Sequence, residues 1–92
     1  METRRLSIVV QGRVQGVGFR YFVRDVARRM NLSGWVRNLF DGGVEIEAQG
    51  DQQKLELFKS EVQEGPPLAY VKEIRVLEIP VEENEMNFVI RH

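Results

Sequence analysis

Residues 12–20 read GRVQGVGFR and set three glycines, Gly12, Gly16 and Gly18, between two segments of different periodicity. The segment before them alternates apolar and polar residues, which is typical of a strand. The segment after them repeats apolar residues every three or four positions, which is typical of a helix. Glycine adopts positive φ without strain, so the backbone can turn sharply here. The sequence therefore predicts a strand, a glycine-rich turn and a helix.

The same stretch has the composition of an anion site. Successive N–H groups of such a turn can line a concave surface, and the start of the following helix adds unpaired N–H groups and the positive end of its dipole. Arg20 ends the stretch with a planar guanidinium that can bind two phosphate oxygens at once. The spacing matches neither a Walker loop nor a dinucleotide fingerprint. A tight turn that binds no ligand is the alternative, and the spacing alone leaves it open.

The other elements follow from periodicity and turn residues. In chain order we expect a strand at 6–11, a helix at 19–30, and strands at 35–40 and 44–49. A second helix follows, capped by Asp51 and ended by Gly65-Pro66-Pro67. A strand at 71–79 with a bulge between Val71 and Ile74, and a short strand at 88–90, complete the chain. Asp41-Gly42-Gly43 predicts a hairpin between the second and third strands. Leu57 lies outside the apolar stripe of the second helix.

This order is the split βαβ pattern of a ferredoxin-like α+β sandwich, in which two helices cover one face of an antiparallel sheet. We expect residues 1–92 to form a single domain. In this topology the first and second strands end at the same edge of the sheet, which brings Asn38 to the glycine-rich turn. Asparagine is disfavoured in strands. It either satisfies backbone groups at the hairpin or directs its amide toward the anion site, and the residues leave both readings open.

Composition excludes several classes of function. A net charge of −1 argues against a nucleic-acid or membrane-surface binder, and the absence of cysteine excludes disulfides and thiol chemistry. The single histidine is His92, the last residue, and no carboxylates have metal-ligand spacing. No general base is evident, because Asp25, Asp41, Glu45 and Glu47 occupy surface or turn positions in the predicted elements. Since no apolar run is long enough for a signal peptide or a membrane helix, we expect a cytoplasmic protein.

Two motifs carry a resemblance to a known family. The run Gly12–Arg20 resembles the first signature of the acylphosphatases. The run Gly34–Asn38, with Asp41-Gly42, Val44 and Gly50 after it, resembles the second. The likeness extends over the whole chain, including its length and the order of its elements.

The resemblance implies hydrolysis of an acyl phosphate to a carboxylate and inorganic phosphate, without metal or cofactor. Arg20 matches the family's phosphate-binding arginine, and Asn38 matches the asparagine that orients the attacking water. The phosphate cradle matches Gln15, Gly16, Val17, Gly18 and Phe19. We expect a monomer that binds this small substrate and neither nucleic acid nor a membrane.

Two other classes share the fold. RNA-recognition domains have the same topology, and residues 16–23 superficially resemble their aromatic motif, but that motif needs aromatic residues on a strand. Here Phe19 and Phe22 continue into helical spacing. A non-catalytic domain of the same family is the second alternative, since fold does not fix function. The presence of both Arg20 and Asn38 argues against it.

Overall fold

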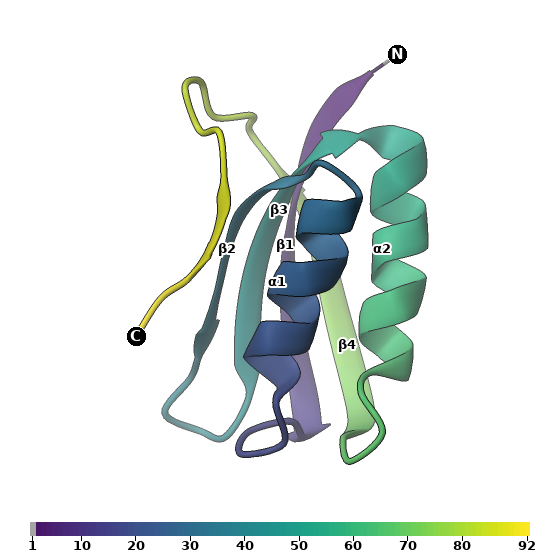
Figure 1. Cartoon of the computed structure of the whole chain (residues 1–92), viewed down its shortest axis with the longest axis vertical. Helices are drawn as coiled ribbons and strands as arrows, with labels where there is room; N and C mark the ends of the chain where they lie inside the picture. Colours follow the sequence, from purple (N-terminus) through teal and green to yellow (C-terminus); the bar gives the residue numbers. More distant parts are fainter. Residues whose placement is uncertain (1) are drawn as a thin grey trace.

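A computed structural model describes residues 2–92. The elements along the chain are β1 (Thr3–Arg13), α1 (Phe19–Arg29), β2 (Ser33–Asn38), β3 (Val44–Asp51), α2 (Gln52–Glu64), β4 (Tyr70–Ile79) and β5 (Phe88–Ile90). Both helices cover the same face of the sheet (Figure 1). The predicted order of elements and the ferredoxin-like arrangement are confirmed.

The sheet has the strand order β4-β1-β3-β2-β5. The pairs among the first four strands are antiparallel, as expected, but β5 pairs with β2 in parallel, so the sheet is mixed. The parallel pairing of β5 with β2 arises because β4, the strand before β5 in the chain, lies at the other edge of the sheet. The chain leaves β4 at the end of the sheet where β2 begins, crosses to the far edge, and enters β5 in the direction of β2 (Figure 1).

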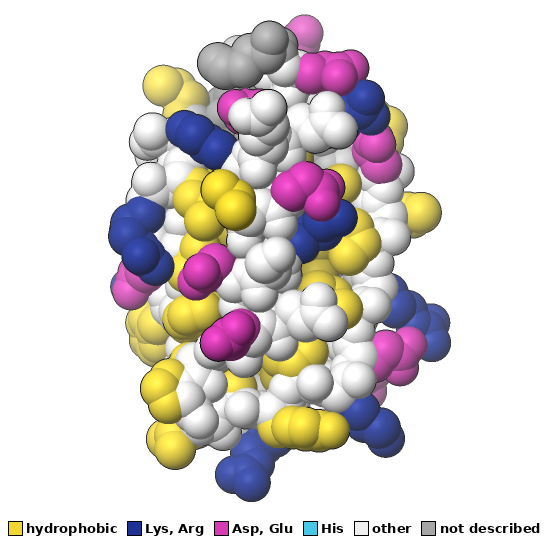
Figure 2. Space-filling view, turned by 90° about the vertical axis from the view of Figure 1, so that its right-hand side faces the viewer, with side chains coloured by type: hydrophobic (Ala, Val, Ile, Leu, Met, Phe, Trp, Pro, Cys, Tyr) yellow, Lys and Arg dark blue, Asp and Glu magenta, His cyan; other side chains and the backbone are white. Residues whose placement is uncertain are grey.

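The core lies between the sheet and the two helices. Residues that alternate along the strands point to one face, and the predicted helical stripes pack against it. The fully buried side chains include Ile8, Val10, Val36, Val44, Ile46, Phe19, Val23, Val26, Leu55, Phe58, Val62 and Phe88. Leu57, outside the stripe of α2, is 62% exposed. The face formed by α2 and β4 carries acidic and basic side chains interspersed with separate hydrophobic ones (Figure 2).

The predicted bulge is present and shifts the register of the β1–β4 pairing close to the glycine-rich turn. Gln11 pairs with Glu73 but Gly12 pairs with Val71, so Lys72 has no partner in the register. Gly12 has φ +134°, and a Cβ atom there would lie 2.2 Å from the carbonyl oxygen of Tyr70. Only glycine permits this approach of the two strands.

The second strand ends earlier than predicted. The sequence predicts a strand that continues to Phe40, but β2 ends at Asn38, and Phe40 is fully exposed at the tip of the hairpin. The reason is the turn itself. The Leu39 N–H donates to the carbonyl of Gly43 at 2.8 Å, and the Gly43 N–H donates to the Asp41 carboxylate at 2.9 Å. These bonds close the turn around residues 39–43, so Asn38 is the last strand residue.

Candidate active site

The loop between β1 and α1 is anchored at both ends and open in the middle. Val14 and Phe19 are buried in the core, at 1% exposure each. Between them, Gly16 and Gly18 have φ values of +75° and +78°. A Cβ atom at either position would have open space around it. Glycine is therefore required here by backbone conformation and not by crowding.

The N–H groups of this loop face no acceptor. Within residues 2–92, the N–H groups of residues 15–21 donate no hydrogen bond, and the first bond of α1 runs from Phe22 to the carbonyl of Gly18 at 3.0 Å. Gly18 is the N-cap and has no side chain to cap the helix, and the first turn contains no acidic residue. These donors and the positive end of the helix dipole form a site suited to an oxyanion.

A pocket of about 130 Å³ lies at this helix start. Its lining residues are Val14, Gly16, Gly18, Phe19, Arg20, Tyr21 and Asn38. Asn38 reaches it because Val36 and Asn38 share the helix-covered face of β2, and the strand ends at the level where α1 begins. In Figure 1, the loop before α1 and the β2–β3 hairpin lie next to each other at the lower end of the molecule.

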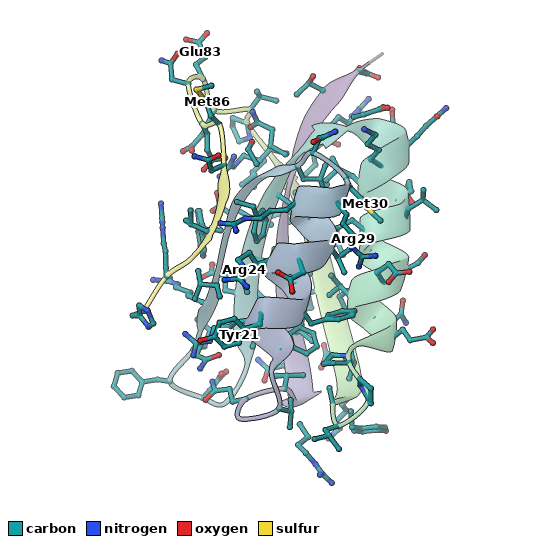
Figure 3. All side chains as sticks on the ribbon, viewed as in Figure 1. Tyr21, Arg24, Arg29, Met30, Glu83 and Met86 are labelled. Carbon is teal, nitrogen blue, oxygen red and sulfur yellow. The ribbon has the colours of Figure 1, made fainter. Side chains whose placement is uncertain are left out.

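The pocket is cationic. None of its lining residues is acidic, and the Arg20 guanidinium forms no ion pair with a carboxylate within residues 2–92. Tyr21 is 58% exposed at the rim, and the Arg24 guanidinium lies 5.1 Å from the centre of its ring. Both come from the first turns of α1 (Figure 3). The side-chain amide of Asn38 likewise has no hydrogen-bond partner in the described chain, so it is free to bind a water molecule.

Two residues of the predicted cradle direct their side chains away from the pocket. Val17 packs against the hydrophobic core. The Nε2 atom of Gln15 donates to the carbonyl oxygens of Leu39 at 2.7 Å and of Gly43 at 2.8 Å. The backbone of both residues remains in the loop. No sequence signal indicates the contacts of Gln15, because both acceptors are backbone carbonyls far along the chain.

Two other cavities have different linings: the guanidinium in the first, that of Arg28, donates to the carbonyl of Phe88, and the second is lined by the carboxylate of Asp51. One of about 230 Å³ lies between the end of α1 and Phe88, and another of about 310 Å³ lies beside Thr3 and Lys54. Residues 2–92 contain no cluster of three His, Asp or Glu side chains placed to hold a metal ion. Neither helix of the described chain has the length and apolar character needed to cross a membrane.

A ferredoxin-like sandwich with an open cationic pocket at the start of its first helix defines a class of small α+β proteins that can bind an oxyanion. Comparison with known proteins identifies the family within this class. The family model described as acylphosphatase matches residues 6–90. An acylphosphatase of Clostridium beijerinckii is 46% identical over 88 residues, covering 96% of this chain and 98% of the relative. One from Archaeoglobus fulgidus is 50% identical over 80 residues, covering 87% and 90%.

Solved structures agree with the sequence relatives. The crystal structure of an acylphosphatase from Bacillus subtilis superimposes with a TM-score of 0.93 at 44% identity, covering 97% of this chain and 99% of that one. The chain belongs to the acylphosphatase family: it is a hydrolase, and an acyl phosphate is its substrate. The resemblance carried by the two motifs is confirmed. The buried position of Phe19 on a helix also removes the basis of the RNA-binding alternative.

Proposed function

We propose that the pocket at the start of α1 holds the phosphoryl group of the substrate. Its ligands are the Arg20 guanidinium and the backbone N–H groups of residues 15–19. The observation that carries this proposal is the convergence in one pocket of a guanidinium without a carboxylate partner, a row of unpaired N–H groups and the amide of Asn38. A dianionic phosphoryl group satisfies all of these donors.

In this proposal Asn38 orients the attacking water. Its amide oxygen accepts a hydrogen bond from the water and turns the water's lone pair toward phosphorus. The pocket has no carboxylate to act as a general base. Phosphoryl transfer tolerates this absence, because its loose transition state depends mainly on positioning and on stabilisation of charge.

The reaction balances without further groups. The water oxygen forms a bond to phosphorus while the bond from phosphorus to the acyl oxygen breaks, and the carboxylate leaves with the electron pair. A phosphoryl oxygen accepts one proton of the water, so the products are a carboxylate and inorganic phosphate. The leaving carboxylate has a conjugate acid of pKa about 4, so it needs no proton from the enzyme. An alkoxide would need one.

We further propose that the enzyme works as a single domain and a monomer, without a metal ion or cofactor, and binds neither nucleic acid nor a membrane. The donor set of the pocket supports the metal-free reaction, since Arg20 and the loop supply the positive charge that a cation would otherwise provide. The expected cytoplasmic location stays a prediction from the sequence.

Phosphate release by the purified protein tests the proposal. A simple acyl phosphate is compared with an unactivated alkyl phosphate monoester, before and after dialysis against a chelator. We expect hydrolysis of the acyl phosphate only, unchanged by chelation, with inorganic phosphate as a competitive inhibitor. Activity that is lost on chelation and restored by one metal would contradict the metal-free mechanism. Comparable hydrolysis of the monoester would contradict the argument from the leaving group.

A further inference from the structure

We propose that Gln15 is a positioning residue for hydrolysis: its side-chain amide fixes the β2–β3 hairpin, and with it Asn38, against the phosphate-binding loop. This inference rests on the proposed role of Asn38 as the residue that orients water. It assigns Gln15 a side-chain function distinct from the backbone contact with phosphate that the loop provides.

The hydrogen bonds of Gln15 define the attachment. Its Nε2 atom lies 2.7 Å from the Leu39 oxygen and 2.8 Å from the Gly43 oxygen. A side-chain amide has two N–H hydrogens, and both are used. The side chain therefore has no donor left for a phosphoryl oxygen, and only the backbone N–H of Gln15 can serve the anion.

The two acceptors are the carbonyls that close the hairpin. Leu39 follows Asn38 directly, and its N–H donates to the same Gly43 carbonyl that Gln15 binds. Gly43 is buried, and its neighbour Val44 is paired with Asn38 across the two strands. One side chain from the phosphate loop thus holds both strands of the hairpin at the position next to Asn38.

Asn38 depends on this attachment because β2 pairs at this position with β3 alone, and the Asn38 side chain makes no hydrogen bond within residues 2–92. It is the last residue of β2, its side chain is exposed, and the hairpin continues beyond it to the fully exposed Phe40. In-line attack requires the water to be placed accurately. A displacement of about 1 Å can cost on the order of 10²-fold in rate. Gln15 links the group that binds phosphate to the group that places water, and so sets the distance between them.

Gln11 provides a matched control. It is also a glutamine that reaches the same hairpin, but its Nε2 atom contacts the Asp41 carboxylate at 3.2 Å, toward the tip. Gln11→Met removes a hydrogen bond to the hairpin without releasing the carbonyls beside Asn38. We expect its kcat to stay within about twofold of the parent.

The test is a double-mutant cycle of Gln15→Met with Asn38→Ala in the full chain, read by kcat, KM and the inhibition constant of inorganic phosphate. Gln15→Met should lower kcat by about 10-fold to 10²-fold and leave the phosphate inhibition constant within about twofold. In the Asn38→Ala background the same change should slow turnover by no more than about twofold, because the group it positions is already absent. Thermal melts record folding. Should Gln15→Met not fold, Gln15→Asn, which keeps an amide on a shorter side chain, replaces it in the cycle.

The outcomes distinguish a failure of the proposed role of Gln15 from a failure of the proposed role of Asn38. If Gln15→Met slows Asn38→Ala by the same factor as it slows the parent, Gln15 does not act through Asn38, and this inference is overturned alone. A weakened phosphate inhibition constant with normal kcat would overturn it as well, since the side chain would then serve the anion site. Normal turnover by Asn38→Ala would overturn the proposed role of Asn38 together with this inference.

Discussion

Arg5 and Arg20 place the same side chain in two opposite environments. Arg5 is fully buried on the sheet face away from the helices, where its guanidinium contacts Glu47 at 2.9 Å and Glu85 at 2.7 Å. Arg20 lies at the start of α1 in a pocket without acidic residues, and it forms no ion pair within residues 2–92. The neighbours of each arginine, and not the arginine itself, decide which one stabilises the fold and which one is free for a ligand.

The Arg5 cluster attaches the segment that connects β4 to β5. Residues 80–87 cross toward the far edge of the sheet, and Arg5 binds Glu85 and Glu82 of that segment. Gln49 adds two hydrogen bonds of 2.8 Å to the backbone of Glu82. Burial disfavours the charge of Arg5, but its hydrogen bonds to Glu85 and Glu47 hold the pKa of the guanidinium above its ordinary value.

The largest expected effect is on turnover at Arg20. Arg20→Ala removes the guanidinium that lines the pocket, and loss of one such charge-stabilising donor typically costs about 10²–10³ in rate. Arg20→Lys should be strongly impaired as well, because it keeps the charge and loses the bidentate geometry. Steady-state kinetics measure the loss, and unchanged melting temperatures would show that the fold is intact. Near-normal turnover in either variant would remove Arg20 from the phosphate site.

Arg5→Ala should have the opposite profile. It leaves Glu47 and Glu85 clustered without their cation, which should destabilise the fold by about 3 kcal/mol and lower the melting temperature by more than about 10 °C. Turnover at a temperature where the variant is folded should be close to that of the parent. Arg75→Ala is the matched control, since Arg75 pairs with Glu73 at 2.8 Å on the surface and should change the melting temperature little. An equal effect of both substitutions would show that burial does not distinguish Arg5.

Asn38→Ala should affect the second task of the pocket, the orientation of water. We expect kcat to fall by about 10²-fold, because the water loses its orienting group. The melting temperature should stay close to that of the parent, since the Asn38 side chain is exposed and makes no hydrogen bond within the described chain. A large loss of stability would instead support the structural reading of Asn38 at the hairpin.

The smallest expected effect concerns acid stability of the hairpin. The hydrogen bonds from the Gly43 N–H and from Gln11 hold the pKa of Asp41 below its usual range. The unfolded chain therefore binds the proton more readily, so the stability that Asp41 contributes is present above about pH 4 and is lost as the pH falls through its lowered pKa. Melting temperatures of the parent and Asp41→Asn should differ near neutral pH and converge in acid. A constant difference across this range would contradict the assignment.

Much of this structure could be predicted from patterns among residues that are close together in the sequence. Alternation and helical spacing predicted every element, because periodicity is a property of neighbouring residues. The glycines at 16 and 18 with Arg20 indicated the anion site that we propose, because backbone conformation is also a local property. The predicted topology also placed Asn38, at the end of the second strand, beside the glycine-rich turn. The predicted end of the second strand was wrong by two residues, because the hydrogen bonds that close the turn outweigh the strand preference of Phe40.

Contacts between polar residues that are far apart in the sequence could not be predicted from local patterns. Arg5 and Glu85 are 80 positions apart, and Gln15 and Leu39 are 24 apart. A glutamine or arginine in a strand or loop looks the same whether its partner is water, a carbonyl or a carboxylate. The parallel pairing of β5 also depends on where the connecting segment crosses, which local preferences do not determine.

Binding of inorganic phosphate to the parent, Arg20→Ala and Asn38→Ala tests most directly whether holding the phosphoryl group and orienting the water are separate tasks of the pocket. Calorimetric titration gives the dissociation constant of each protein, beside the kcat of the two variants. We expect Asn38→Ala to bind phosphate within about twofold of the parent while its kcat falls, and Arg20→Ala to lose both binding and turnover. Equal weakening of phosphate binding in the two variants, or normal binding by Arg20→Ala, would contradict this division.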